Sequence, residues 1–325
     1  MAAAPSQLFS LLFDKETTEG TEVNATVDFG LVQECDIVPT NTILENPAFG
    51  SRNVDTLEFG EYTAEGKIRA FWQHGRILEL ALGTVGHAGA GDPYTHTYTE
   101  ANTLPSFTVE KAVNFATGDD IVETFTGCKV DSLELTLGTA GVLEWSARVL
   151  GMSSNTTDVT ATAASIASLP TFPSSTATVS IGVDASEVAI GQVTNMTFRI
   201  NNNLLRLPQF GARTPAGHAE GSRRYEGTIT AAFDATTEYP WFYGLTGTTS
   251  PQNTAIQTTT ILIALTRDTA TRTLNIELNG VALERIGTAQ RLGEVVYQEL
   301  GFKAKSIGTV TSKDSISSTA WSGSD

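Results

Sequence analysis

The chain has 325 residues, enough for about two domains. Its formal net charge is −16 and its pI about 4.6, which disfavours binding to nucleic acid or to anionic membranes, because both require Lys and Arg against phosphate. Charged residues make up only 17% of the sequence, whereas Thr, Ser, Gly and Val are abundant, a mixture typical of strands joined by turns. The acidity suits a surface past which DNA moves without sticking, and equally a protein that stays dissolved at high salt.

Residues 1–25 are interpreted as an N-terminal arm. The opening segment, MAAAPSQLFSLLF, lacks the basic segment of a signal peptide, so we expect it to dock on a neighbouring subunit or element. No run reaches about 18 consecutive apolar residues, so no membrane-spanning segment is predicted.

Residues 26–151 alternate apolar and polar side chains over several short runs, which predicts half-buried antiparallel strands. These runs are GKIRAF (66–71), SFTVEKAV (106–113), VDSLELTL (130–137) and LEWSARVL (143–150). The segment 74–83 places Ile77, Leu78, Ala81 and Leu82 on one face and predicts a helix. Residues 31–60 show little periodicity and are predicted to be a long loop.

Residues 152–177 are rich in Ser, Thr, Ala and Pro and are interpreted as a linker. Residues 178–307 then repeat the pattern of strands, in TVSIGV (178–183), NMTFRI (195–200), EGTITAAF (226–233), TLNIEL (273–278) and EVVYQEL (294–300). A second helix is predicted at 236–245, a second long loop at 201–223 and a hairpin turn at Asn279-Gly280. The Ser-rich tail 308–325 is predicted to be mobile.

The two halves resemble each other at a constant offset. PAFGSR (47–52) returns as PQFGAR (208–213), and the offset that carries Pro47 onto Pro208 is called the first offset below. It also carries Glu65-Gly66 onto Glu226-Gly227 and Gly83 onto Gly244, whereas the later segments correspond at a shorter offset, with Glu144 on Glu294. We therefore predict an internal duplication of one all-β unit, each copy with one flanking helix and one long loop.

The repeated loop motif offers candidate contact residues: Pro47, Phe49, Arg52, Pro208, Phe210 and Arg213. In one interpretation the loop folds back and its Phe plugs the core. In the other, Phe and Arg anchor a contact between subunits, since aromatic residues and Arg are enriched in the cores of interfaces.

No pattern for chemistry is found, and no catalytic residue, metal site or cofactor is assigned. The segment GEYTAEGKI (60–68) has a poor spacing for a phosphate loop and ends in Ile68 where Ser or Thr is needed. The four histidines are not spaced as metal ligands on a helix, and Cys35 and Cys128 are interpreted as small buried side chains. The sequence thus predicts that the protein is not an enzyme.

Three segments carry a resemblance to a known family: 94–110 (YTHTYTEANTLPSFTVE), 125–151 (FTGCKVDSLELTLGTAGVLEWSARVLG) and 201–234 with NNNLLRLPQFGAR and EGSRRYEGTITAAFD. Over residues 58–310 the chain resembles the tail tube proteins of siphoviruses, in the branch with subunits of about 300 residues. The resemblance implies two tandem units of β-sandwich or partial-barrel form, each with a long loop that reaches the next ring. It also implies a virion protein assembled in the host cytoplasm, whose stacked rings form a hollow tube for double-stranded DNA. The expected partners are further copies, tape measure, terminator and baseplate proteins, and DNA that passes without specific binding.

If each subunit supplies two units, three subunits complete a pseudo-six-fold ring, with six subunits as the alternative. Other tail components of related fold, a terminator or a baseplate hub, remain as alternative functions. A second alternative is a surface β-sandwich that binds carbohydrate through Trp72, Trp145 or Trp241, although these lie at core-like positions. The acid-rich, Lys-poor composition favours a salt-loving host.

Overall fold

A computed structural model describes residues 9–50, 52–113, 120–156, 160–161, 169–183, 186–232, 239–243, 259–268, 271–289 and 296–321. The described part is mostly strands. The first half contains β1 (Phe9–Lys15), β2 (Val27–Asp28), β3 (Leu31–Cys35), β4 (Val38–Pro47), β5 (Val54–Phe71), α1 (Arg76–Leu82), β6 (Gly83–Ala88), β7 (Tyr94–Glu100), β8 (Phe107–Val113), β9 (Ile121–Gly138), β10 (Glu144–Gly151) and β11 (Ser153–Asn155). The second half contains β12 (Ala177–Val183), β13 (Val188–Ala189), β14 (Val193–Asn201), β15 (Leu205–Arg206), β16 (His218–Ala219), β17 (Arg224–Ala232), α2 (Tyr239–Tyr243), β18 (Thr259–Arg267), β19 (Arg272–Ala289), β20 (Tyr297–Asp314) and α3 (Ser318–Trp321).

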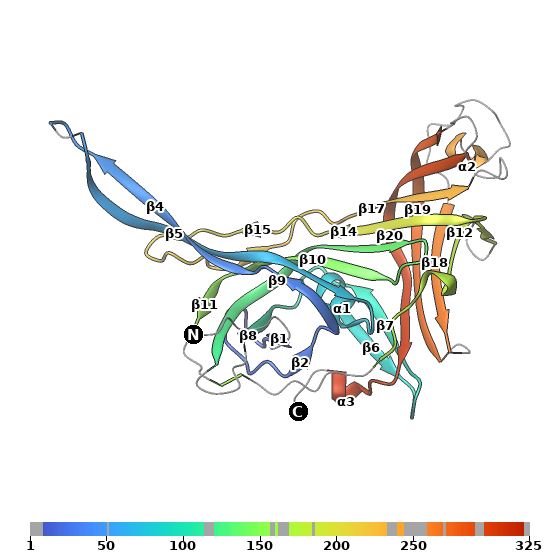
Figure 1. The fold of residues 1–325 in the computed structure, drawn as a ribbon, viewed down its shortest axis with the longest axis horizontal. Coiled ribbons are helices and arrows are strands. Elements are labelled where there is room, and N and C mark those ends of the chain that lie inside the picture. Colours follow the sequence, from blue (N-terminus) through green and yellow to red (C-terminus); the bar gives the residue numbers. More distant parts are fainter. Residues whose placement is uncertain are drawn as a thin grey trace.

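Every strand pairing in the described part is antiparallel, and the strands of both halves continue one another (Figure 1). The central row runs β5, β10, β9, β14, β17 and β20, so β14 of the second half pairs directly with β9 of the first. In the first half, β2, β1, β8, the start of β9 and β11 form a second row. In the second half, β13, β12, β18 and the start of β19 do the same.

The long strands β9 and β19 each serve two rows and bend at a glycine. Gly127 in β9 has a φ of 63°, and Gly280 in β19 has a φ of 62°. This left-handed conformation is easy only for glycine and turns the strand from one row to the other. The hairpin predicted at Asn279-Gly280 was therefore wrong: the chain kinks there and β19 goes on pairing with β20.

The early parts of the two halves pair in registers that repeat at the first offset. Val38 lies opposite Glu65, and their counterparts Arg199 and Glu226 lie opposite each other in the same way. The bulge between Val32 and Glu34 recurs, at the same offset, between Val193 and Asn195.

The later parts correspond at a second offset, which differs from the predicted one. The first offset carries Phe71 onto Ala232; Phe71 faces Glu144 and Ala232 faces Tyr297, so Glu144 corresponds to Tyr297 and not to Glu294. The step from Glu144 to Tyr297 is called the second offset below. It also carries Gly127 onto Gly280 and the bulge at Asp131 in β9 onto the bulge at Glu284 in β19.

Side chains from both halves pack into one continuous hydrophobic core. Trp72 and Trp145 are 1% exposed, and Cys128 is fully buried and free, while Cys35 is half-buried and free. The predicted amphipathic helix is present as α1, whose apolar face is buried as expected. The helix predicted at 236–245 is seen as α2, and its flanking residues, Gly244 among them, lie outside the described part.

Both ends of the described chain belong to the fold. β1 pairs with β8 and buries Leu11 and Leu12 in its own chain. The N-terminal arm was expected to dock on a neighbouring subunit or element, and this stretch of it docks on an element of the same chain. The mobile tail was wrong for residues 308–321, because β20 continues to Asp314 and Trp321 in α3 is 2% exposed. The Trp321 indole Nε1 donates to Glu79 Oε2 at 2.7 Å and closes this end over α1. Within the predicted linker, β11 pairs with β9.

The long loop predicted at 31–60 was also wrong, since most of it is strand. The outer parts of β4 and β5 form a hairpin that projects beyond the body of the molecule (Figure 1). This hairpin, residues 41–62, is called the arm below. The counterpart loop 202–223 contains only the short pair β15 and β16, because Pro208, Gly211, Pro215 and Gly217 interrupt any longer ladder.

Candidate assembly surfaces

The arm carries an apolar face that its own chain leaves in solvent. Ile43 lies opposite Phe59 and Leu57 opposite Glu45, and directly opposed residues of an antiparallel pair share one face. Ile43, Leu57 and Phe59 are 48%, 66% and 63% exposed. An apolar face of this kind on a slender projection indicates a contact with another molecule.

The tips of the arm and of loop 202–223 present the predicted motif. Phe49 and Phe210 are both fully exposed, so the interpretation in which Phe plugs the core was wrong. Each is followed by a glycine at positive φ, 92° at Gly50 and 83° at Gly211, so the two tips turn alike. Pro47, Arg52 and Pro208 are exposed as well.

Arg213, the last residue of the second motif, holds the two segments together. Its guanidinium lies 4.7 Å from the centre of the Phe59 ring, its Nε donates to the Gly60 carbonyl at 3.0 Å, and another of its nitrogens donates to Asn41 Oδ1. The Tyr62 amide donates to the Arg213 carbonyl at 2.9 Å. Loop 202–223 thus lies against the base of the arm.

A buried cation fastens the other side of loop 202–223. Lys129 in β9 is 3% exposed, and its Nζ lies 2.9 Å from Glu19 Oε2 and 3.0 Å from Glu220 Oε1. Burial opposes the charge of Lys129, but the hydrogen bonds and charges of the two carboxylates outweigh it and raise the pKa of the ammonium. His218 Nδ1 lies 3.3 Å from Glu19 Oε1, and burial lowers the pKa of this imidazole despite the carboxylate.

The repeat-defining residues lie where strands approach closely. Within the described part they are Glu65, Gly66, Gly83, Glu226 and Gly227. A Cβ on Gly66 would lie 2.4 Å from Ile37 Cα, and one on Gly227 would lie 2.3 Å from the Thr197 carbonyl oxygen, so neither position admits a side chain. Gly83 ends α1 with a φ of 129°.

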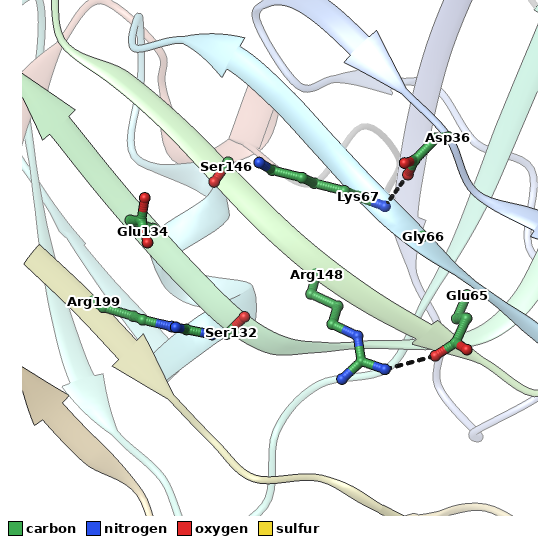
Figure 2. A pocket seen from close by; sticks show the side chains of 9 residues that line it. All are labelled: Asp36, Glu65, Gly66, Lys67, Ser132, Glu134, Ser146, Arg148 and Arg199. Atoms are coloured by element: carbon green, nitrogen blue, oxygen red, sulfur yellow. Dashed lines mark hydrogen bonds and ion pairs between the residues drawn. The ribbon is translucent and has the colours of Figure 1, made fainter.

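The outward face of the central row is polar and rich in ion pairs. Figure 2 shows a shallow hollow on it, lined by charged and Ser side chains of β5, β9, β10 and β14. There Arg148 lies 2.8 Å from Glu65 and 3.1 Å from Asp131, and the Lys67 amide donates to the Asp36 carboxylate. Across β19 and β20, Arg285 lies 3.5 Å from Glu299 and Lys303 lies 2.8 Å from Glu284. Opposite charges alternate along the face, so it offers no basic patch that would retain phosphate.

The central row continues through β3 and the start of β4 at one end and through the late part of β19 at the other, and both of these end strands have an open edge in the described part. The equivalent edges of β14 and β9 are closed, because these two strands pair with each other. The late part of β9 has β10 on one side and β14 on the other. The late part of β19 has β20 on one side, and residues 281–289 have no described strand on the other. Likewise β14 lies between β17 and β9, whereas β3 and the start of β4 pair only with β5. Such edges are sites for strand addition.

A longer motif than the predicted one marks this junction. Asn202, the counterpart of Asn41 at the first offset, donates through Nδ2 to the carbonyls of Ala81 and Val130, each at 3.0 Å. Both copies read Asn-x-(Ile or Leu)-Leu-x-x-Pro-x-Phe-Gly-x-Arg, at 41–52 and 202–213. The matching Asn residues were a sequence signal, but an isolated Asn in a polar loop carried no role until the bulge it contacts was seen.

Two histidines of the described part lie against each other on the neighbouring strands β6 and β7. His87 and His96 face each other with Nδ1 atoms 2.7 Å apart, but no group of three or more His, Cys, Asp or Glu side chains in the described ranges is placed to hold a metal ion. Trp72 and Trp145 are buried and form no sugar platform, and Trp241 is partly buried against the core. None of the described helices has the length and apolarity to cross a membrane.

Exposed apolar projections and open strand edges on a molecule made mostly of strands indicate a structural subunit that assembles with other molecules. A comparison with protein families agrees, because residues 8–316 match the family described as phage tail tube protein. The chain belongs to the phage tail tube protein family. It is thus a structural tail tube subunit and not an enzyme, a component of the virion tail that assembles with further copies into a tube. A search of curated proteins finds no match.

Proposed function

We propose that each chain supplies two tandem tail-tube units, and that three chains close one ring by repeating between subunits the strand junction found within the chain. Stacked rings then form the hollow tube of a long-tailed virus, through which double-stranded DNA passes. The observation that carries the proposal is the closed pairing of β14 with β9 beside the two open edges at the equivalent positions of β3 and β19.

The two offsets supply the register of the new junction. Within the chain, Arg199 lies opposite Glu134. The counterpart of Arg199 at the first offset is Val38, and the counterpart of Glu134 at the second offset is Gly287. Val38 of one subunit then lies opposite Gly287 of its neighbour. Because every junction in the ring has the same form, three chains provide six similar positions, and no strand edge of the central row stays open.

The polar face of the central row is the surface we assign to the lumen. Its paired charges leave few cations free to hold phosphate, and the net charge of −16 repels DNA at longer range. The arms and the exposed Phe49 and Phe210 reach the adjacent ring, where their apolar surface becomes buried. Terminator, baseplate and tape measure proteins meet the same surfaces at the ends and inside the tube, and the acidic composition supports a salt-loving host.

A cross-link tests the junction. In a Cys35→Ser background, the double variant Val38→Cys, Gly287→Cys places two thiols opposite each other only between subunits. A Cβ at Gly287 meets only Arg285, at 3.6 Å, so the glycine tolerates the change. We expect covalent trimers as the largest closed species on a denaturing gel after oxidation, and no ladder from either single variant. Images of the tube with six chains per ring, or closed covalent hexamers, would overturn the three-chain ring.

A further inference from the structure

The closed junction within the chain has a polar lock at the bulge of β9. The Asn202 amide donates to the Asp131 carbonyl at 2.8 Å, and the Leu204 amide donates to Asp131 Oδ1 at 2.9 Å. The Asn202 side chain adds its bonds to Val130 and Ala81. The bulge turns this backbone and this carboxylate away from β10 and toward the incoming strand.

The corresponding residues are present at the two open edges. At the first offset, Asn41 and Ile43 are the counterparts of Asn202 and Leu204. At the second offset, Leu283 and Glu284 are the counterparts of Val130 and Asp131, and Glu284 occupies the equivalent bulge of β19. The residue type is the same at each position: both segments have an Asn, both have an apolar residue two positions later, and both bulges carry an acidic residue.

One polar atom of each of these side chains already has a partner within the chain. The other polar atom of Asn41 and of Glu284 is available to a neighbouring subunit. Asn202 Oδ1 accepts from Arg223 Nε at 2.8 Å, and Asn41 Oδ1 accepts from Arg213 in the same way. The side-chain nitrogen of Asn41, Nδ2, has no acceptor among the described residues. One carboxylate oxygen of Asp131 accepts a hydrogen bond from Arg148 and the other accepts one from the Leu204 amide. In Glu284, Oε1 accepts from Lys303 at 2.8 Å, and the second oxygen has no donor in the described part.

We propose that Asn41 of one subunit locks onto the Glu284 bulge of a second copy of the chain. The Asn41 Nδ2 donates to the neighbour's Leu283 carbonyl, its backbone amide to the neighbour's Glu284 carbonyl, and the Ile43 amide to the free Glu284 carboxylate oxygen. The Phe242 carbonyl of α2, the counterpart of the Ala81 carbonyl at the first offset, lies where a second bond from Asn41 Nδ2 ends. This inference rests on the proposed ring and names the residues that give it register.

The matched substitution in the two copies separates assembly from folding. Asn41→Asp keeps the acceptor for Arg213 and removes the donor, and Asn202→Asp does the same inside the chain. Because Asn41 is exposed and Asn202 is 2% exposed, we expect Asn202→Asp to lower the melting temperature of the unassembled chain and Asn41→Asp to leave it unchanged. Asn46→Asp, also on the arm and bonded only to Thr56 within the described part, is the control.

The readout is the yield of covalent trimer from the Val38→Cys, Gly287→Cys pair at increasing protein concentration. We expect Asn41→Asp to raise the concentration for half-maximal yield by about tenfold, as loss of the two hydrogen bonds of Nδ2 at each junction predicts, and Asn46→Asp to leave it unchanged. An unchanged yield with Asn41→Asp, or a melting temperature lowered as much as by Asn202→Asp, would overturn the lock while leaving the ring intact. Absence of any cross-link in the parent pair would instead overturn the ring.

Discussion

The arm and loop 202–223 share a motif in their first parts, 41–52 and 202–213, yet they fold differently. The arm is a hairpin with two register shifts, and its cross-strand pairs include Ile43 with Phe59 and Asn46 with Thr56. The loop carries Arg206 and Leu207 where the arm has Glu45 and Asn46, and two prolines and two glycines follow within its turn. The loop is therefore held by outside partners, and the arm by its own ladder.

The difference shows which of the two segments finds its contacts within the single chain. Loop 202–223 is fastened to the first half by Lys129 on one side and by Arg213 on the other. Within the described part, the arm is held only near its base, by Arg213 and by the Tyr62 hydroxyl, which lies 2.5 Å from Ser154 Oγ, and its outer part projects past these contacts. Loop 202–223 thus finds its contacts in the same chain, whereas the apolar face of the arm stays exposed in the single chain.

The largest expected effect is on the fastening of the loop. Lys129→Met removes a buried ammonium group, since Lys129 is only 3% exposed. The carboxylates of Glu19 and Glu220 are then left without their shared cation. Breaking a buried ion pair costs about 3 kcal/mol, and we expect that loss in the free energy of unfolding measured with urea. Lys303→Met, at an exposed pair, is the control and should cost under about 1 kcal/mol. Equal losses in the two variants would contradict the assigned difference.

A smaller effect is expected where loop and arm meet. Arg213→Ala removes the stacking on Phe59 and the bonds to Gly60 and Asn41, all at the surface, so we expect a loss of about 1 kcal/mol. Hydrogen exchange should become faster at the base of the arm, at Tyr62 above all. Arg52→Ala, the same change at the other tip, should alter neither quantity in the unassembled chain. Equal exchange rates at Tyr62 in both variants would show that the clamp holds nothing.

The sequence predicts the central strands, because their side chains alternate between apolar and polar. It also predicts that the two tips correspond, because both contain the PxFGxR motif. The arm was not predicted, because its outer strands face solvent on both sides and so lack the alternation that burial imposes. The Asn279-Gly280 kink was missed for a related reason: the dipeptide that favours a two-residue turn also permits a bend within a long strand. The tail was missed because its Ser-rich composition hid several buried side chains, among them Val310, Ile316 and Trp321.

The locks at the bulges were the least predictable part of the candidate surfaces. An acid in a strand reads as a solvent-facing residue, and only the pairing shows that Asp131 and Glu284 are extra residues with their backbone turned outward. Matching letters were also insufficient, because the later segments were aligned by placing Glu144 on Glu294, whereas the register makes Tyr297 the counterpart of Glu144.

The smallest expected effect is a pH dependence confined to the loop. Burial lowers the pKa of His218, so its neutral form is favoured in the folded chain and this contribution to stability is present above the unfolded pKa of about 6.5. It is lost as the pH falls below that value, because the folded state must then take up a proton on a ring whose Nε2 is buried without a partner in the described part. The protection factors for hydrogen exchange in loop 202–223 should therefore fall as the pH is lowered from 7.5 to 5.5, while those in the arm stay constant. In His218→Gln the difference between loop and arm should no longer depend on pH, and its persistence would assign the effect to another group.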